Sequence, residues 1–166
     1  MGNTVGSRDK ILNISPSEAG FIAGFLEGDG CISAKISPTS GSYRTYIVIS
    51  FAQHPKNRIV LEYLQKLIGG YLNDYSHHEM SELVIRDRQS VKEILQRLHS
   101  FLISKKEQAR LALMIIEILD RSSRGKQRPQ TEVIESVKLA EQIRLLNSNR
   151  KNKVVHTLQR VVERLQ

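Results

Sequence analysis

The sequence has only one cysteine, Cys31, among its 166 residues. A lone cysteine rules out a disulfide within the chain and a zinc site built from several thiolates. Such cysteine usage is typical of a reducing compartment, so we expect an intracellular protein, in the cytoplasm of a prokaryote or within an organelle. The sequence also has no apolar run long enough to span a bilayer and no signal peptide, and Gly6 breaks the pattern for N-terminal myristoylation. We therefore expect no membrane partner.

Acidic residues are fewer than basic ones. The sequence has 17 Asp and Glu and 25 Lys and Arg, which gives a formal net charge of +8. The basic residues recur from Lys10 to Arg164 without forming a tail, which favours a folded basic surface and a polyanionic partner. The length and the 40% hydrophobic content suit one core of ordinary size. We predict a single domain over residues 1–166, with a flexible arm at 1–14 and a basic connector and last helix at 147–166.

A helix is predicted to begin at Pro16. Ser15 and Glu18 have the spacing of a capping box, and a proline is tolerated at the first helical position, where its missing N–H is not needed. The helix carries glycines four residues apart, each of which costs about 1 kcal/mol relative to alanine, so they need a compensating reason. They share one face of the helix. We predict that another backbone approaches closely along this face, which is made by Gly20, Ala23, Gly24 and Gly28.

The same helix is predicted to end in acids. Glu27 falls on its last turn and Asp29 just beyond, and each is followed by a glycine. The carboxyl end of a helix repels anions, so these carboxylates indicate a nearby cation, and a divalent metal would satisfy them. The alternative is a glycine-rich helix cap that runs into an Asp-Gly turn and has no chemical role.

Apolar periodicity predicts the remaining elements, which cover residues 31–37, 44–53, 55–68, 71–88, 90–102, 104–119, 131–146 and 154–165. The first two are strands of a hairpin, and residues 71–88 form a second hairpin. Ser90 and Ser104 are predicted to cap the helices that follow them. Val48 and Val84 fall on the outward faces of their strands. The order predicts an α+β fold with an αββαββα core, a four-stranded antiparallel sheet and additional C-terminal helices.

One face of this sheet is predicted to carry long or hydrogen-bonding side chains, as a surface that reads base edges in a major groove needs. The alternative is an ordinary solvated sheet face. The residues of the face are Ser33, Lys35, Ser37, Arg44, Tyr46, Ser50, Asn73, Tyr75, Glu82 and Arg86, together with His77 at the tip of the second hairpin. Three further basic residues, Arg150, Lys151 and Lys153, are predicted to contact phosphates without reading sequence.

The stretch I-A-G-F-L-E-G-D-G at residues 22–30 resembles the nine-residue signature of the LAGLIDADG homing endonucleases, and the order of elements resembles that of the single-motif, group I intron-encoded members. The resemblance implies that the signature helix packs against its copy in a homodimer and that Asp29 binds the catalytic metals. It also implies that four strands form a saddle in the major groove of double-stranded DNA. By the same resemblance Gln53 and Arg58 lie near the scissile phosphate, and Lys105, with Lys106 as the alternative, is the active-site lysine.

The activity implied by the resemblance is double-strand DNA cleavage with 3′ overhangs at a long, pseudo-palindromic target, in support of intron mobility. Two Asp29 carboxylates and the adjacent Gly28 carbonyls would bind Mg²⁺, or Mn²⁺ in its place, since these cations take oxygen ligands. The alternatives are a catalytically silent LAGLIDADG regulator that binds DNA and an intron maturase that binds RNA. A generic basic DNA-binding module is a third interpretation, but it leaves the acidic end of the signature helix unexplained.

Overall fold

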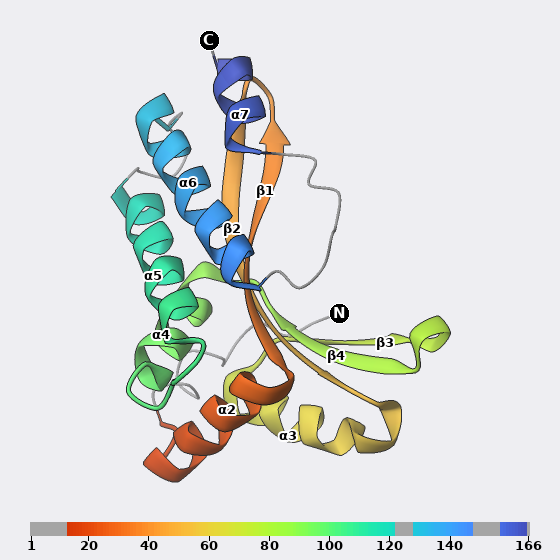
Figure 1. Ribbon diagram of the computed structural model, residues 1–166. Coiled ribbons are helices and arrows are strands. Elements are labelled where there is room, and N and C mark those ends of the chain that lie inside the picture. The colour runs from red at the N-terminus through yellow and green to blue at the C-terminus, as the bar shows by residue number, and fades with distance from the viewer. Residues whose placement is uncertain (1–12, 122–127, 148–156, 166) are drawn as a thin grey trace. The chain divides into compact units, whose positions relative to one another are not determined.

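The computed structural model describes residues 13–121, 128–147 and 157–165 (Figure 1). The predicted arm up to residue 12 and the phosphate-contacting residues Arg150, Lys151 and Lys153 lie outside this part of the chain. The described residues form two compact units. The first unit contains residues 13–31 and 48–106, and the second contains residues 32–47 and the described residues from 107 onward. The prediction of a single domain stays a prediction.

The element order confirms the predicted fold class. The strands are β1 (Gly30–Thr39), β2 (Ser42–Gln53), β3 (Tyr71–Tyr75) and β4 (Met80–Ile85), and they form one sheet in the order β1-β2-β4-β3. The helices are α2 (Pro16–Asp29), α3 (Arg58–Ile68), α4 (Arg88–Leu98), α5 (Lys106–Arg121), α6 (Gln130–Asn147) and α7 (Leu158–Leu165). Strand β4 is antiparallel to both of its neighbours. In the described part of the chain no helix combines the length and apolar character that a membrane span needs.

In the first unit, α2 is anchored at both ends. The predicted capping box is present, because Ser15 accepts the backbone N–H of Glu18 and the Glu18 carboxylate accepts the backbone N–H of Ser15. Further along, the ring of Phe25 stacks on Phe51 of β2, with centroids 5.9 Å apart. Helix α2 also packs against α4, and α3 packs against β3 and β4. The signature helix is therefore held against the carboxyl-terminal half of β2.

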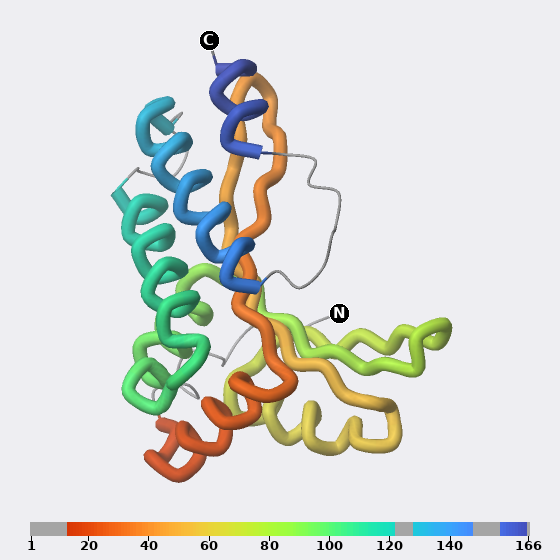
Figure 2. The backbone as a smooth tube through the Cα atoms, in the orientation of Figure 1, coloured from red at the N-terminus to blue at the C-terminus, as the bar shows by residue number. Residues whose placement is uncertain are grey.

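In the second unit, one face of the β1–β2 hairpin is covered by α6 and α7, which Figure 2 shows beside it. Tyr43 of β2 is buried in a cluster with Val133, Val137 and Val161, and Ile36 of β1 packs against that cluster. Two strand positions further, Thr45 is buried and its hydroxyl hydrogen-bonds that of Ser136 on α6 at 3.1 Å. The alternation of β1 and β2 therefore separates a buried apolar face from a polar one, as predicted.

Two predicted helix starts are wrong. Helix α4 is capped by Asp87 instead of Ser90: the Asp87 carboxylate accepts the Ser90 backbone N–H at 2.9 Å, and the helix ends at Leu98. Aspartate is as good an N-cap as serine, so residue type alone does not favour Ser90 over Asp87. Helix α5 begins at Lys106, so Ser104 lies one residue before the N-cap position, and its hydroxyl donates to the Glu27 carboxylate.

Two strand residues predicted to face outward are buried. Val48 is 8% exposed and Val84 is 3% exposed. Val84 lies on the central strand β4, with Ser50 of β2 and Tyr71 of β3 as its register partners, so side chains on both neighbouring strands shield it. Val48 lies two residues before Ser50 on β2, so the two side chains are on the same face of the sheet. Strict alternation predicted the face of these residues correctly but not their burial.

Gly30, at the junction of α2 and β1, is required by close backbone packing. A Cβ atom at this position would lie 2.7 Å from the Cα atom of Leu26 and 2.8 Å from its carbonyl oxygen. Gly30→Ala is therefore expected to lower the free energy of unfolding by about 1–3 kcal/mol, the usual cost of overpacking, as measured by urea denaturation. Gly20→Ala is the matched control, because the nearest described atoms that its methyl would meet outside the helix backbone belong to the Phe101 ring, at 3.8 Å, an ordinary contact. Equal stability of the two variants would contradict this account of the junction.

Candidate active site

Asp29 and Gln53 meet where α2 and β2 end. The Gln53 side-chain amide donates a 2.6 Å hydrogen bond to the exposed Asp29 carboxylate, and its carbonyl oxygen accepts one from Asn57 at 3.3 Å. This meeting follows from strand alternation, because Gln53 shares a face with Phe51, whose ring is stacked on α2. The structure thus brings together two of the residues that the sequence singled out, and it fixes the orientation of the Asp29 carboxylate.

The other acid of α2, Glu27, is fully occupied within the chain. Its carboxylate accepts the backbone N–H groups of Ile103 at 2.8 Å, Ser104 at 3.1 Å and Lys105 at 3.1 Å, and it also accepts the Ser104 hydroxyl. Burial raises the pKa of the Glu27 carboxyl, but these hydrogen bonds outweigh it and lower the pKa to about 2. Glu27 is therefore ionised near neutral pH, and its charge is satisfied without a cation.

Lys105 turns back onto α2. Its ammonium group donates a 2.5 Å hydrogen bond to the backbone carbonyl of Glu27, in the last turn of the helix. Helix carboxyl ends favour cations, so this position suits a lysine. Asp29 belongs to the last turn of α2, and both Gln53 and Lys105 contact that turn. Lys106 is exposed at the first position of α5, and the geometry favours Lys105 over it.

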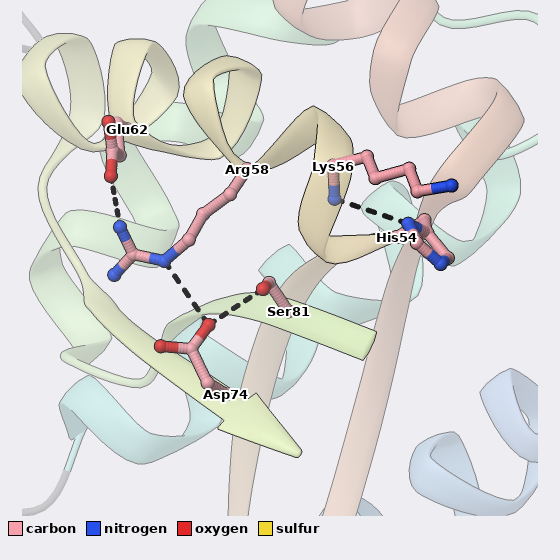
Figure 3. A network of polar contacts seen from close by, with 6 residues as sticks. All are labelled: His54, Lys56, Arg58, Glu62, Asp74 and Ser81. Atoms are coloured by element: carbon pink, nitrogen blue, oxygen red, sulfur yellow. Dashed lines mark hydrogen bonds and ion pairs between the residues drawn. The ribbon is translucent and has the colours of Figure 1, made fainter. Parts of the chain in front are cut away.

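Arg58 points to a different set of residues. Figure 3 shows its guanidinium between Glu62 on α3 and Asp74 on β3, with the Asp74 contact at 3.2 Å. Asp74 in turn accepts the Ser81 hydroxyl at 2.6 Å, and the hydrogen bonds to Ser81 and Arg58 lower the pKa of its carboxyl. Figure 3 also draws His54 and Lys56. The Nδ1 atom of His54 accepts the backbone N–H of Lys56 at 3.2 Å. None of these contacts joins Arg58 to Asp29, so its role near the scissile phosphate stays a prediction.

The glycine-rich face of α2 is divided in two by the structure. Apart from the helix's own backbone, a Cβ atom at Gly24 or Gly28 would meet nothing within 4 Å among residues 13–121, 128–147 and 157–165, and the neighbouring Phe21 is 44% exposed. Gly20 instead faces the ring of Phe101, and Ala23 is buried at 1% exposure. The open strip on α2 therefore consists of Phe21, Gly24 and Gly28, and Ala23 does not belong to it because it faces the interior of its own chain.

A family model described as LAGLIDADG endonuclease matches residues 22–117, more than half of the chain. The chain belongs to the LAGLIDADG endonuclease family. Among its relatives, the DNA endonuclease I-CreI of Chlamydomonas reinhardtii is 31% identical over 146 residues, which cover 86% of this chain and 86% of that protein. The DNA endonuclease I-CvuI of Chlorella vulgaris is 26% identical over 138 residues, which cover 81% of this chain and 83% of that protein.

Solved structures agree with this assignment. A crystal structure of the homing endonuclease I-CvuI, in complex with the I-CreI target and in the presence of magnesium, matches with a TM-score of 0.79 and 26% identity. The match covers 90% of this chain and 92% of that chain. The archaeal intron-encoded homing endonuclease I-Vdi141I, complexed with DNA, shares the fold at a TM-score of 0.76. The single-motif LAGLIDADG fold predicted from the sequence is therefore confirmed.

The LAGLIDADG helix offers oxygen ligands for a metal, but few of them. The described residues contain no cluster of three or more His, Cys, Asp or Glu side chains that could bind a metal ion. Asp29 supplies an exposed carboxylate, and the carbonyl of Gly28 has no amide partner within the helix, which ends at Asp29. A carboxylate and a backbone carbonyl are ligands that hard divalent cations accept. This donor set fits such a cation and is incomplete in one LAGLIDADG chain.

The polar sheet residues can be placed within each unit. In the second unit, Lys35 and Arg44 are exposed, and the Arg44 guanidinium lies 6.0 Å from the ring centre of Tyr46 on the same strand face. In the first unit, Asn73 pairs with Glu82 across β3 and β4, and the Tyr75 hydroxyl donates to Glu82 at 3.3 Å. The remaining predicted residues of this set are Ser33, Ser37 and Ser50, which are partly exposed, and His77 and Arg86, which are exposed.

Sequence reasoning missed two residues of this LAGLIDADG chain. Tyr71 begins β3 on the same face as Asn73 and Tyr75 and is 54% exposed. The alternation of these three residues was the signal that could have found it. Glu27 was recognised as an acid in need of a cation, but its contacts to residues 103–105 lie too far away in the sequence for any local pattern to predict.

Proposed function

We propose that this protein is a homing endonuclease, a homodimer that uses a divalent metal to hydrolyse one phosphodiester in each strand of a specific DNA duplex. The observation that carries the proposal is the gathering of Asp29, Gln53 and Lys105 at the last turn of the LAGLIDADG helix. The relatives I-CreI and I-CvuI are DNA endonucleases, and I-CvuI was crystallised with the I-CreI target in the presence of magnesium and with its own target in the presence of calcium. Cleavage on both strands would leave 3′ overhangs and promote the mobility of an intron that encodes the protein.

The homodimer is supported by the open strip on α2. Glycines inside a helix cost about 1 kcal/mol each relative to alanine, and at Gly24 and Gly28 no neighbouring atom in the described part of the chain requires their small size. A second copy of the strip, packed against the first, supplies the missing reason, since small residues let two helices approach closely. Two-fold packing of these helices brings the two Asp29 carboxylates to one place and predicts a long, pseudo-palindromic target.

The chain's own residues have separable tasks in this proposal. Asp29 and the Gly28 carbonyl bind Mg²⁺ or Mn²⁺, which supplies Lewis-acid stabilisation of the scissile phosphate and a lowered pKa for bound water. Gln53 holds the Asp29 carboxylate in a fixed orientation through its 2.6 Å hydrogen bond. Lys105 brings a positive charge to the same helix end, where it can offset the charge that develops on phosphate oxygens.

The polar sheet face supports sequence-specific binding to double-stranded DNA. Exposed Lys35 and Arg44 are suited to guanine edges, and Asn73 is suited to adenine, in the pairings that a major groove allows. The net charge of +8 favours association with a polyanion. These side chains lie on alternate positions of their strands, so each of them addresses the same side of the sheet within its unit.

The test is cleavage of a plasmid that carries the intronless form of the gene flanking the reading frame. We expect linearisation with Mg²⁺ and none with EDTA, because removal of the metal removes the Lewis acid. Metal-independent retention of the plasmid without any cutting would instead identify a silent DNA-binding regulator. Preferential retention of the intron RNA without DNA cleavage would identify a maturase, and either outcome would overturn the proposal.

A further inference from the structure

The first acid of the signature, Glu27, binds the turn that carries Lys105. Its carboxylate accepts three successive backbone N–H groups, those of Ile103, Ser104 and Lys105, in addition to the Ser104 hydroxyl. Consecutive amides that converge in this way form a concave site for an anion. Residues 103–105 precede α5 and have no helical hydrogen-bond ladder of their own. The Glu27 charge therefore holds together a turn that otherwise has little regular structure.

Lys105 is attached to Glu27 at both of its ends. Its backbone N–H is bound by the Glu27 carboxylate at 3.1 Å, and its ammonium group is bound by the Glu27 backbone carbonyl at 2.5 Å. The first contact fixes where the lysine side chain starts, and the second fixes where it ends. Because Asp29 follows two residues later in the same helix, the distance between the lysine ammonium and the Asp29 carboxylate depends on this double attachment.

We propose that Glu27 is a positioning residue, which sets the location of the Lys105 ammonium beside Asp29 and does not itself bind the metal. The inference rests on the proposed endonuclease function and adds a residue to it. Glu27 has no free hydrogen-bonding capacity to offer a metal without giving up the turn, because its carboxylate already accepts the four donors named above. Its effect on cleavage is therefore exerted through Lys105.

The first test is Glu27→Gln. The glutamine keeps the length of the side chain but removes the charge. Its NH₂ group is a donor, so it cannot accept hydrogen bonds from the N–H groups that the carboxylate accepts in the wild type. We expect the single-turnover cleavage rate under Mg²⁺ to fall by about 10–100-fold, because a displacement of about 1 Å at a reacting centre has an effect of this size. The dissociation constant for target DNA, measured with Ca²⁺ in place of Mg²⁺, is expected to change by less than about twofold, since Glu27 does not lie on the sheet face that reads DNA.

The second test separates positioning from a general structural role by a double-mutant cycle with Lys105→Met. If Glu27 acts through Lys105, adding Glu27→Gln to Lys105→Met slows cleavage no further, because the group to be positioned is absent. Multiplicative losses would overturn the inference and indicate an independent role such as metal binding. An unchanged rate in the single Glu27→Gln variant would overturn it as well.

A third measurement does not depend on nuclease activity. Hydrogen exchange of the metal-free and DNA-free protein is expected to show faster exchange at the Ile103, Ser104 and Lys105 amides in Glu27→Gln, because their acceptor is weakened. Unchanged exchange would refute the role of Glu27 even if the protein proves not to cut DNA. An inactive wild-type protein with the expected change in exchange would refute only the proposed function.

Glu18→Gln is the matched control for these measurements. Glu18 is a glutamate of the same helix, its carboxylate also accepts a backbone N–H, that of Ser15, and its pKa is likewise lowered by its hydrogen bonds to Ser15. It lies at the opposite end of α2 from Lys105. We expect Glu18→Gln to lower stability slightly and to leave the cleavage rate and the exchange of residues 103–105 unchanged.

Discussion

Asp29→Asn is expected to abolish DNA cleavage and to leave DNA binding intact. The substitution keeps the size of the side chain and removes the charge of the single carboxylate that the LAGLIDADG helix exposes at its end. In a homodimer it removes two charged ligands at once. We expect the single-turnover rate to fall by at least about 10³-fold, as for other residues that act directly on the reacting groups. Binding is expected to persist because the polar face of the sheet is unaltered.

The measurement pairs a plasmid cleavage assay in Mg²⁺ with a gel-shift titration in Ca²⁺. Asp120→Asn is the control, since Asp120 is an exposed aspartate on a different helix, α5, and its substitution removes the same charge. It is expected to cut at the wild-type rate. Residual cleavage by Asp29→Asn at more than about a tenth of the wild-type rate would show that the assignment of Asp29 as the metal ligand is wrong.

Replacing both open glycines, as Gly24→Ala/Gly28→Ala, is expected to separate the two subunits without unfolding them. Beyond the backbone of the helix itself, neither methyl meets an atom within 4 Å among the described residues, and alanine is the better helix former by about 1 kcal/mol per site, so the helix itself should gain stability. In a dimer, however, the added methyls fall between two closely packed backbones. Overpacking costs about 1–3 kcal/mol per site, or about 2–6 kcal/mol for the two positions, so the dimer dissociation constant is expected to rise by about 30-fold to about 10⁴-fold.

Sedimentation velocity over a range of concentrations measures this shift, and circular dichroism checks that helix content is kept. Gly20→Ala is the control. Gly20 has the same four-residue spacing as the other two glycines of the helix, but it faces Phe101 of its own chain. It is expected to remain dimeric. A double variant that sediments like the wild type would place the subunit contact elsewhere on the molecule.

The contrast between Gly20 and Gly24 illustrates what local patterns predict and what they do not. The spacing of the glycines correctly predicted one helix with one face of small residues, because 3.6 residues per turn fixes which positions align. The spacing could not predict that Phe101 covers one end of that face, since this contact joins residues more than 80 positions apart. Helix α4 presents a simpler case, in which Asp87 and Ser90 were both acceptable caps and only the fold selected one of them.

The sequence by itself determined the start of α2, the alternation of the strands and the family, and it singled out Asp29 and Lys105 as candidate site residues. These depend on short-range geometry or on a nine-residue motif, and both are readable without tertiary contacts. Only the tertiary structure decided that Glu27 binds the turn at residues 103–105, that Gln53 reaches Asp29 and that Arg58 is engaged by Glu62 and Asp74. Each of these contacts joins separate elements, and a hydrogen bond depends on distances within a few tenths of an ångström, which packing sets and residue order alone does not.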